Sequence, residues 1–356
     1  MNIENTVLSN KGLYPIGPEK TIIAGPCSAE TEEQVMATAT ALQGMGVTAF
    51  RAGIWKPRTR PGCFEGVGAP ALAWLRRVQR ELNLPVIIEV GSARHVEQAL
   101  AAGVDMVWVG ARTTANPFAM QDIADALKGT DIPVFVKNPI NADLELWIGA
   151  LERLNRNGIN HLAAVLRGFS SYEKTLYRNP PQWQIGIELR RRVPGLPLLC
   201  DPSHISGRRD LVPSVCHQAM DLGFDGLMIE CHCQPNAAWS DAAQQLTPAE
   251  LHTLLSTLDV RSHSSAGDIL NRFRSRIDHV DAAIVDLLAE RMHISHEMGA
   301  LKREQDVMVL QTDRYNDILS SIEANGTAKG LNSEFLHKIF ETIHAESIAQ
   351  QLDKNE

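Results

Sequence analysis

The sequence predicts an α/β protein in which a (β/α)8 (TIM) barrel precedes a small all-α domain of three helices that forms an intertwined dimer. Eight short apolar stretches recur between residues 21 and 232, and a segment of helical pattern follows each of them. Beyond residue 258 the chain contains no proline and no tryptophan. Strands that alternate with helices over roughly 250 residues are typical of the closed parallel barrel, and the change of composition indicates a second domain.

The expected strands share an apolar centre and a polar C-terminal end. They occupy residues 21–27, 48–54, 85–91, 106–111, 133–139, 161–169, 197–204 and 226–232. Polar motifs at six ends are AGPCS (24–28), KPRT (56–59), GAR (110–112), VKN (136–138), RGF (167–169) and DPSH (201–204). These residues could simply begin loops, but turn chemistry does not explain repeated Arg and Lys. In such a barrel the C-terminal strand ends form the active-site face.

The domain division follows from the segment 259–267, which is polar and Ser-rich and is typical of a linker. We expect a barrel over 1–258 and a helical domain over 268–356. Apolar residues at spacings of three and four between Ile269 and Leu301 predict one helix of roughly 35 residues. Two shorter helices, about 311–324 and 332–352, are expected on either side of a turn with the sequence NGTAKG.

A helix of this length cannot bury its apolar stripe alone. We therefore expect the long helices of two chains to pair in an intertwined homodimer, and a higher assembly is compatible with the pattern. The alternative is a simple coiled-coil dimerisation module. That module would explain the apolar stripe but not the charged residues that accompany it.

The overall charge excludes several classes of partner. A formal charge of −8 argues against a general nucleic-acid or membrane-surface role, because those partners require an excess of basic residues. No apolar run approaches the roughly 18 residues of a membrane span, and the start MNIENTVLSN lacks the pattern of a signal peptide. We therefore expect a cytoplasmic protein.

The six cysteines form no CxxC pair, so reduced thiols are expected. Cys231, His232 and Cys233 look like a fragment of a zinc site. Strand alternation, however, would direct Glu230 and His232 to one side and the two cysteines to the other. A separate zinc site at this position is therefore disfavoured.

Basic residues from different strand ends should converge at one barrel mouth. They are Arg51, Lys56, Arg58, Arg112, Lys137 and Arg167. Arginine binds carboxylate and phosphate in a bidentate manner and lysine adds a compact charge, so phosphorylated and carboxylated small molecules are the natural ligands. Thr59 adds a hydroxyl donor beside Arg58.

Four further side chains at the strand ends could bind a metal ion: Cys27, His204, Glu230 and Asp241. Mixed sulfur, nitrogen and oxygen ligands suit a divalent transition metal such as Mn, Fe, Co or Zn better than Mg or Ca. The metal would act as a Lewis acid on a carbonyl oxygen. Taken singly, each residue has an ordinary structural explanation, and only the set indicates a metal site.

The barrel motifs, together with RAGIWKPRT (51–59), GRRD (207–210) and IECH (229–232), closely resemble the 3-deoxy-D-arabino-heptulosonate 7-phosphate (DAHP) synthases of type I, β subgroup. The resemblance covers about residues 15–258. It implies the first step of the shikimate pathway, in which phosphoenolpyruvate and erythrose 4-phosphate give DAHP and phosphate, with no organic cofactor.

The resemblance also implies roles for individual residues. Cys27, His204, Glu230 and Asp241 correspond to the metal ligands. The phosphoenolpyruvate contacts correspond to Arg51, Lys56, Arg112, Lys137 and Arg167. The erythrose 4-phosphate contacts correspond to Arg58 and Thr59, with Asp201 near the aldose hydroxyls and Lys56 between both substrates.

Lys137 and Glu89 are our candidates for handling the proton of the attacking water, although Glu89 could equally be the structural partner of an arginine. The sister family that makes 3-deoxy-octulosonate 8-phosphate shares the barrel and the phosphoenolpyruvate site. Its lysine loop lacks KPRT. The KPRT motif here therefore favours the four-carbon aldose.

The helical domain carries its own polar set. Arg291 and Lys302 are eleven residues apart and share nearly one helix face, and Arg274 could reach the pocket of a dimer partner. Ser347 and Gln351 form an i, i+4 pair on the last helix. Solvated charges on a long helix are the alternative explanation for any one of these residues.

The run LLAERMHISHEMGALK (287–302) resembles the all-helical chorismate mutases, which rearrange chorismate to prephenate. The resemblance implies active-site roles for Arg274, Arg291, Lys302, Arg314, Ser347 and Gln351, with Lys302 and Gln351 donating to the ether oxygen. Gln311 and Tyr315 depart from the family's acidic residues. Each could still contact the substrate.

Two functions remain open for this domain. It could be a second enzyme, or it could be a sensor of chorismate or prephenate that adjusts the barrel. Both roles can coexist, because a site that binds product can also bias a conformational equilibrium. The retained donors Lys302 and Gln351 favour catalysis, with feedback regulation as a further role.

Overall fold

The computed structural model describes residues 8–11, 20–58, 62–258, 268–310 and 312–352. Thr59, Gln311 and the expected linker 259–267 lie outside this part of the chain. The chain divides into two compact units, Met1–Ser262 and His263–Glu356. Within the described residues, no helix is both long enough and apolar enough to cross a membrane.

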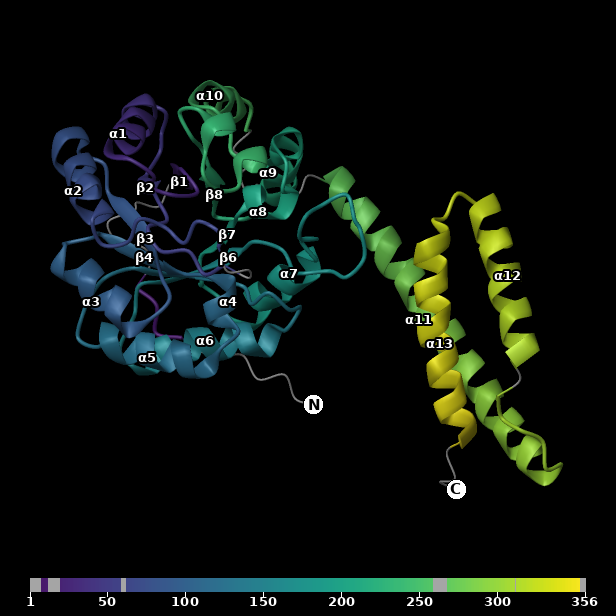
Figure 1. Cartoon of the computed structure of the whole chain (residues 1–356). Helices are drawn as coiled ribbons and strands as arrows, with labels where there is room; N and C mark the ends of the chain where they lie inside the picture. The colour runs from purple at the N-terminus through teal and green to yellow at the C-terminus, as the bar shows by residue number, and fades with distance from the viewer. Residues whose placement is uncertain (1–7, 12–19, 59–61, 259–267, 311, 353–356) are drawn as a thin grey trace. The chain divides into compact units, whose positions relative to one another are not determined.

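Eight parallel strands close into a barrel in the order in which they follow one another along the chain (Figure 1). They are β1 (Thr21–Gly25), β2 (Ala49–Arg51), β3 (Val86–Val90), β4 (Met106–Val109), β5 (Val134–Lys137), β6 (Leu162–Leu166), β7 (Leu198–Cys200) and β8 (Gly226–Glu230). β8 pairs with β1 from Thr21 opposite Gly226 to Gly25 opposite Glu230, which completes the closure. The predicted (β/α)8 barrel is confirmed.

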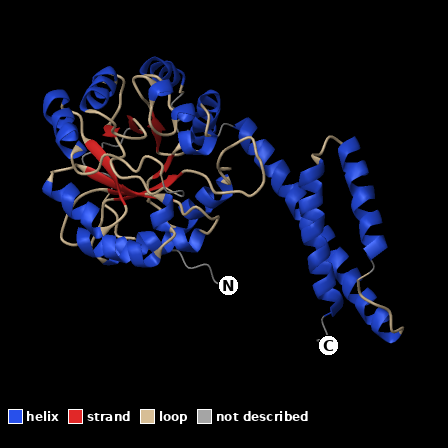
Figure 2. Ribbon diagram, in the orientation of Figure 1, coloured by secondary structure: helices blue, strands red, loops and turns tan. Residues whose placement is uncertain are grey.

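Helices surround the strands on the outside of the barrel (Figure 2). They are α1 (Glu32–Ala41), α2 (Ala71–Leu82), α3 (Ala93–Ala101), α4 (Ala111–Thr114), α5 (Pro117–Leu127), α6 (Leu144–Arg156), α7 (Trp183–Arg192), α8 (Pro202–Ser206), α9 (Val212–Asp221) and α10 (Pro248–Thr257). Short 3-10 turns lie at η1 (Arg209–Leu211), η2 (Pro235–Ala237) and η3 (Ala242–Gln244). Side chains cap several N-termini, as Asp143 does for α6.

An inner apolar layer fills the barrel and fixes where its polar mouth begins. The layer consists of Ile23, Ala49, Ile87, Met106, Trp108, Phe135, Ala163, Val165, Leu199 and Met228. Side chains alternate along a strand, so the residue two positions further on faces the same interior. Two positions after six of these residues stand the charged side chains Arg51, Glu89, Lys137, Arg167, Asp201 and Glu230. The strand period therefore places charge directly above the apolar layer.

Two glycines give this charged ring its space. Gly25 and Gly110 stand two positions after inner-layer residues of β1 and β4. A Cβ atom at Gly110 would lie 2.1 Å from Oε1 of Glu89, and one at Gly25 would lie 2.2 Å from the carbonyl oxygen of Arg51. Any side chain at either position would therefore displace the ring.

The second unit consists of α11 (Asp268–Glu304), α12 (Thr312–Ala328) and α13 (Ser333–Leu352), which confirms the predicted three helices. The chain turns at Gly330, the last residue of NGTAKG, but the expected helix end at 324 was wrong, because α12 continues to Ala328. Gly326, the other glycine of this segment, lies within α12. A Cβ atom there would lie 2.3 Å from Cδ1 of Leu336, so this glycine allows α12 and α13 to pack closely rather than forming a turn.

The long helix α11 leaves a row of apolar side chains in contact with solvent. Its members are Phe273, Ile277, Val280, Ile284 and Leu287, each about half exposed or more. The helix pairs with α13 through its C-terminal half, where Gly299 lies against the backbone of Gln351. This chain alone therefore covers only part of the stripe that the sequence pattern predicted.

Candidate active sites

Asp201 is the buried centre of the barrel mouth. One carboxylate oxygen, Oδ2, lies 2.6 Å from Nζ of Lys137 and 2.8 Å from Nδ1 of His204, and NH1 of Arg51 is 4.0 Å away. The other oxygen, Oδ1, accepts a hydrogen bond from the backbone N–H of His204 and caps α8. A single side chain at the end of β7 thus organises groups from β2, β5 and α8.

Burial and charge act in opposite directions on this cluster. Burial alone would raise the pKa of Asp201, but His204, Lys137 and Arg51 hold that pKa well below its ordinary value. Burial lowers the pKa of Lys137, and Asp201 offsets part of this effect. Asp201 thus favours the charged form of the buried lysine.

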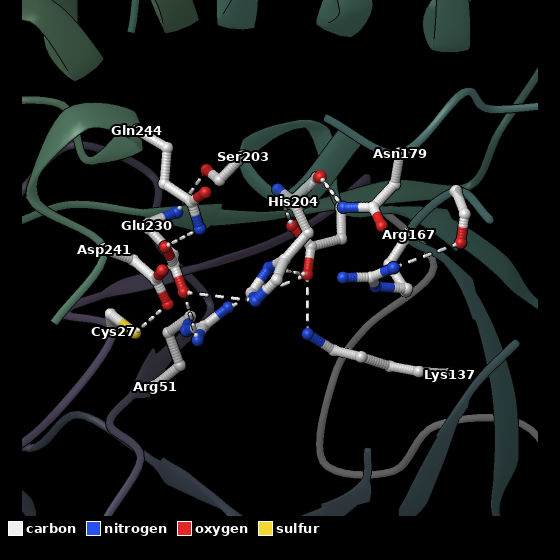
Figure 3. A network of polar contacts seen from close by, with 12 residues as sticks. Cys27, Arg51, Lys137, Arg167, Asn179, Ser203, His204, Glu230, Asp241 and Gln244 are labelled. Atoms are coloured by element: carbon white, nitrogen blue, oxygen red, sulfur yellow. Dashed lines mark hydrogen bonds and ion pairs between the residues drawn. The ribbon is translucent and has the colours of Figure 1, made fainter. Parts of the chain in front are cut away.

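Glu230, at the end of β8, is held from several sides. Oε1 accepts a hydrogen bond from NH2 of Arg51 at 3.0 Å, and Oε2 accepts one from Nε2 of Gln244 at 2.6 Å. Its backbone N–H donates to Oγ of Ser203. Figure 3 shows Arg51, Gln244 and Ser203 around Glu230. Burial opposes ionisation, but His204 and Arg51 lower the pKa of Glu230, so the carboxylate is charged.

Cys27 and Asp241 meet across the mouth. Sγ of Cys27 lies 3.3 Å from Oδ2 of Asp241 and 3.4 Å from Nζ of Lys56. Burial, followed by the charge of Glu230, raises the pKa of the Cys27 thiol to about 12. Asp241 has a left-handed backbone with φ of 47°, an uncommon conformation for a residue other than glycine, and NH1 of Arg178 donates to its Oδ1 at 2.9 Å.

The donor chemistry of these four side chains fits a metal ion. Nδ1 of His204 faces Asp201, which leaves Nε2 as the ring nitrogen nearest Glu230, 3.8 Å from its Oε1. A carboxylate behind one nitrogen is the usual support of a metal-bound histidine. Burial lowers the pKa of His204, so the ring is neutral and can donate a lone pair. Within the described residues, no group of three or more His, Cys, Asp or Glu side chains is arranged to hold a metal ion.

A cavity of about 600 Å³ opens above this cluster. Its lining includes the predicted residues Lys56, Arg58, Glu89, Arg112, Lys137, Arg167, His204 and Asp241. Cys27, Arg51, Asp201 and Glu230 are almost fully buried. The barrel thus brings together the predicted residues that the structure describes, and Thr59 lies outside the described part of the chain.

The cavity carries an excess of positive charge. Burial lowers the pKa of Arg167 to about 10, and repulsion by Arg178 and Arg112 adds to this effect against the attraction of Asp201. Such mutual repulsion is relieved when an anion binds between the guanidinium groups. The cavity is therefore suited to phosphate and carboxylate groups.

Glu89 adds a carboxylate to this cationic wall. It lines the cavity, and Oε1 points towards the space that Gly110 leaves open. Its charge adds to the field that favours the charged forms of Arg51 and Lys137. Both roles considered for Glu89, proton transfer and support of an arginine, are compatible with this position.

Sequence reasoning missed several residues of the mouth. Arg178 and Asn179 line the cavity from the loop between β6 and α7, and Arg178 contacts both Asp241 and Gln244. Oε1 of Gln245 accepts the backbone N–H of Cys27. None of these residues ends a strand, so the pattern that identified the others gave no signal for them.

In the helical unit, Lys302 of α11 and Gln351 of α13, the pair to which the family resemblance gives a shared role, lie in contact. Nζ of Lys302 donates to Oε1 of Gln351 at 3.0 Å and to the carbonyl oxygen of Val309 at 2.7 Å. NH1 of Arg303 donates to the backbone carbonyl of Gln351. The amide of Gln351 is therefore held at the contact between α11 and α13.

Ser347 lies one turn before Gln351 and is buried against α11. Its Oγ is 2.5 Å from Oγ of Ser295, which the sequence pattern did not single out. NH1 of Arg291 lies 3.5 Å from the carbonyl oxygen of Ile343, and burial lowers the pKa of Arg291. Arg291 and Lys302 of α11 thus both contact α13.

The remaining predicted residues of this unit lie further out. Arg274 and Arg314 are exposed, and Tyr315 is half-buried and packs its ring on that of His344. At 1.5 Å per residue, the 28 residues between Arg274 and Lys302 span roughly 40 Å of one helix. Arg274 therefore cannot share a pocket with Lys302 of the same chain.

The closed barrel and its cationic mouth define a (β/α)8 barrel protein whose site suits small, multiply anionic ligands. Residues 5–264 match the model of the DAHP synthetase I family, and residues 273–352 match the chorismate mutase type II model. Because the first match covers most of its length, the chain belongs to the DAHP synthetase I family. Both resemblances inferred from the sequence are confirmed.

Known proteins similar to this chain include aldolases of two kinds. A phospho-2-dehydro-3-deoxyheptonate aldolase from Thermotoga maritima is 34% identical over 226 residues, which cover 64% of this chain and 65% of the relative, just under two thirds of its length. A 2-dehydro-3-deoxyphosphooctonate aldolase from Magnetococcus marinus is 29% identical and covers 67% of this chain and 86% of the relative.

Solved structures show the same fold in the barrel. The crystal structure of the Thermotoga maritima DAHP synthase is 30% identical, with a TM-score of 0.62 over 72% of this chain and 73% of that one. A truncated form of the 3-deoxy-D-arabino-heptulosonate 7-phosphate synthase from the same organism is 28% identical, with a TM-score of 0.60, and 91% of that chain is covered.

Proposed function

We propose that this chain is a bifunctional enzyme of aromatic biosynthesis. The barrel condenses phosphoenolpyruvate, erythrose 4-phosphate and water to DAHP and phosphate. The helical unit rearranges chorismate to prephenate. The observation that carries the first activity is the ring of cations above the buried Asp201–Glu230 cluster, within a chain of the DAHP synthetase I family.

The substrate roles follow from the chemistry of the mouth. Arg112, Lys137 and Arg167 bind the carboxylate and phosphate of phosphoenolpyruvate, with Arg51 beneath them and Lys56 between the two substrates. Arg58 binds the phosphate of the aldose, and Thr59 adds a donor. Asp201, which the family resemblance places near the aldose hydroxyls, fixes the ammonium of Lys137 and the ring of His204.

Cys27, His204, Glu230 and Asp241 would hold one divalent transition metal ion, Mn, Fe, Co or Zn. Bound there, the metal would supply Lewis acidity to the aldehyde oxygen. The protein orients His204 through Asp201 and the two carboxylates through Arg51, Gln244 and Arg178. Lys56 lies beside the Cys27 sulfur and favours its thiolate form.

Lys137 and Glu89 are the groups that handle the proton of the water added during condensation. Both line the cavity, and burial lowers the pKa of Lys137, which favours release of a proton from its ammonium group. Glu89 lies across the opening that Gly110 provides. The reacting carbon therefore has a proton donor and an acceptor within one cavity.

In the helical unit, Arg291 and Arg314 bind the two carboxylates of chorismate, and Lys302 and Gln351 donate to its ether oxygen. The Lys302–Gln351 contact supports this assignment, because Nζ of Lys302 lies 3.0 Å from Oε1 of Gln351 and the two side chains can therefore reach the same substrate atom. Ser347, Tyr315 and Gln311 complete the site. The site also requires an arginine from the N-terminal end of α11. We assign this role to Arg274 of a second copy, because Arg274 and Lys302 of one chain lie far apart along the same helix.

We further propose that the chain forms a homodimer through α11 and that prephenate or chorismate bound to the helical unit regulates the barrel. The exposed stripe from Phe273 to Leu287 supports the dimer. A cytoplasmic location suits these substrates. The alternative is a DAHP synthase whose helical unit only senses its ligand.

The decisive experiment measures both reactions on the purified full-length chain. DAHP formation is expected to stop when the metal is chelated and to return with added Mn²⁺, Co²⁺ or Zn²⁺. Chorismate loss is expected to be unaffected by the chelator. Synthase activity that persists without metal would contradict the proposed site, and binding of chorismate without turnover would identify the helical unit as a sensor.

The octulosonate relatives suggest a second aldose. Arabinose 5-phosphate should therefore be compared with erythrose 4-phosphate under the same conditions. The KPRT motif predicts a strong preference for the four-carbon sugar. A higher kcat/KM with the five-carbon sugar would reverse the assignment of the barrel.

A further inference from the structure

His344 of α13 occupies the same helix face as two predicted site residues. It precedes Ser347 by three residues and Gln351 by seven, spacings that bring side chains to one side of a helix. Its ring packs on that of Tyr315 from α12, with centroids 4.3 Å apart and planes 34° apart. The imidazole is therefore held between two helices at the edge of the proposed mutase site.

The imidazole has an unused polar atom. Nε2 of His344 is buried and has no hydrogen-bond partner among the residues that the structure describes. A buried polar atom without a partner lowers stability, so most such atoms in folded proteins are paired. A bound ligand would supply the missing partner.

The surroundings of His344 favour an anionic ligand. The charged or titratable side chains that act on it are Arg291 and Lys302 from α11 and, through the ring contact, Tyr315 from α12. Burial, followed by the charges of Arg291 and Lys302, lowers the pKa of His344. The ring is therefore neutral at pH 7 and can donate a hydrogen bond without adding a third positive charge.

We propose that His344 is a ligand-contacting residue of the helical site and that its Nε2 hydrogen-bonds an oxygen of the bound dicarboxylate. This inference rests on the proposed function only in that the helical unit binds chorismate or prephenate. It does not require turnover. Tyr315 holds the plane of the ring, and the two cations neutralise the carboxylates beside it.

The proposal has a consequence that a structural histidine would not share. A dicarboxylate bound beside Arg291 and Lys302 offsets their repulsion of a protonated imidazole. The pKa of His344 therefore rises when the ligand binds, and binding takes up part of a proton at a pH close to that pKa. This uptake is measured by calorimetric titration with prephenate in two buffers of different ionisation enthalpy.

Three variants of the full-length chain test the contact. His344→Leu removes the polar atom, and we expect prephenate to bind at least roughly tenfold more weakly, with proton uptake lost. His344→Gln keeps an N–H near the position of Nε2 and should bind within about threefold of wild type, without the proton uptake. His337→Gln is the matched control on the same helix, because His337 pairs with Glu323 and Glu341 instead.

Thermal unfolding separates binding from packing. His344→Leu removes an unpaired buried atom, so the melting temperature of the helical unit should stay the same or rise while binding weakens. Unchanged prephenate affinity in His344→Leu would overturn the proposal. Equal losses in the Leu and Gln variants, with a lower melting temperature, would also overturn it, because they indicate a packing role.

The outcome for chorismate turnover is independent of this test. If wild type binds prephenate in a His344-dependent manner but does not consume chorismate, the contact is supported and the mutase activity fails. If His344→Leu rearranges chorismate and binds prephenate as wild type does, the activity stands and the contact fails. Absence of prephenate and chorismate binding in wild type would overturn both.

Discussion

Gln244 shows how a single uncharged residue can organise the barrel mouth. Its Nε2 donates to Oε2 of Glu230 at 2.6 Å, and its Oε1 accepts a hydrogen bond from NH1 of Arg178 at 2.8 Å. The same arginine nitrogen donates to Asp241. One buried amide therefore connects two of the proposed metal-binding carboxylates, which come from β8 and from the loop after it.

Replacing Gln244 with Ala should loosen both carboxylates. We expect metal affinity to fall by about 10- to 100-fold, the usual effect of removing a group that orients a ligand. The measurement is calorimetric titration of the metal-free full-length chain with Mn²⁺. Gln234→Ala, at an exposed position of the same loop, is the control and should bind as wild type does. Equal Mn²⁺ affinities for wild type, Gln244→Ala and Gln234→Ala would contradict a role for Gln244 in metal binding.

At the scale of helices, glycine acts in opposite ways in the two units. Gly299 of α11 faces α13 so closely that a Cβ atom would lie 2.6 Å from Cα of Gln351. Gly149 of α6 has no atom within 4 Å of the position its Cβ would take. The same substitution should therefore destabilise one helix and stabilise the other.

We predict that Gly299→Ala lowers the stability of the helical unit by about 1–3 kcal/mol, because the added methyl group forces α11 and α13 apart. Chorismate turnover should fall with it, since Gln351 moves. Gly149→Ala should stabilise the barrel by about 0.5–1 kcal/mol, because alanine suits a helix interior better than glycine. Calorimetry of the full-length variants measures both. A stabilising Gly299→Ala would contradict the close helix contact.

At the scale of the whole molecule, the exposed stripe of α11 predicts self-association. Ile284→Lys places a charge in its centre and should convert the proposed dimer into a monomer, as light scattering would show. Mutase activity should fall steeply with it, because the site would lose Arg274 of the second copy. Asp286→Lys, about 200° away on the helix, is the control. An Ile284→Lys variant that stays dimeric would place the interface elsewhere.

A second prediction at this scale concerns communication between the two units. A protease site inserted within 259–267 allows the purified full-length chain to be cut after folding. We expect synthase activity to survive the cut and its response to prephenate to be lost, since regulation requires the helical unit to remain attached. An identical prephenate response before and after separation of the two fragments would rule out regulation by the helical unit.

Much of the barrel and its mouth could be predicted from the sequence because strand periodicity is local. Each inner-layer residue, such as Phe135, fixes the direction of the residue two positions later, here Lys137. Closure of the barrel then brings the strand ends together. Arg178 and Gln244 could not be predicted in this way, because they come from loops whose course depends on long-range packing.

The sequence by itself determined the barrel, the three helices and the set of charged residues at the strand ends, because repeating patterns of two and of three to four residues specify strands and helices directly. Only the tertiary structure decided which partners those residues have. Asp201 proved to be the buried centre of the mouth, Gly326 a packing residue and not a turn, and His344 a neighbour of Arg291 and Lys302. These roles arise from contacts between distant segments, which no local pattern encodes.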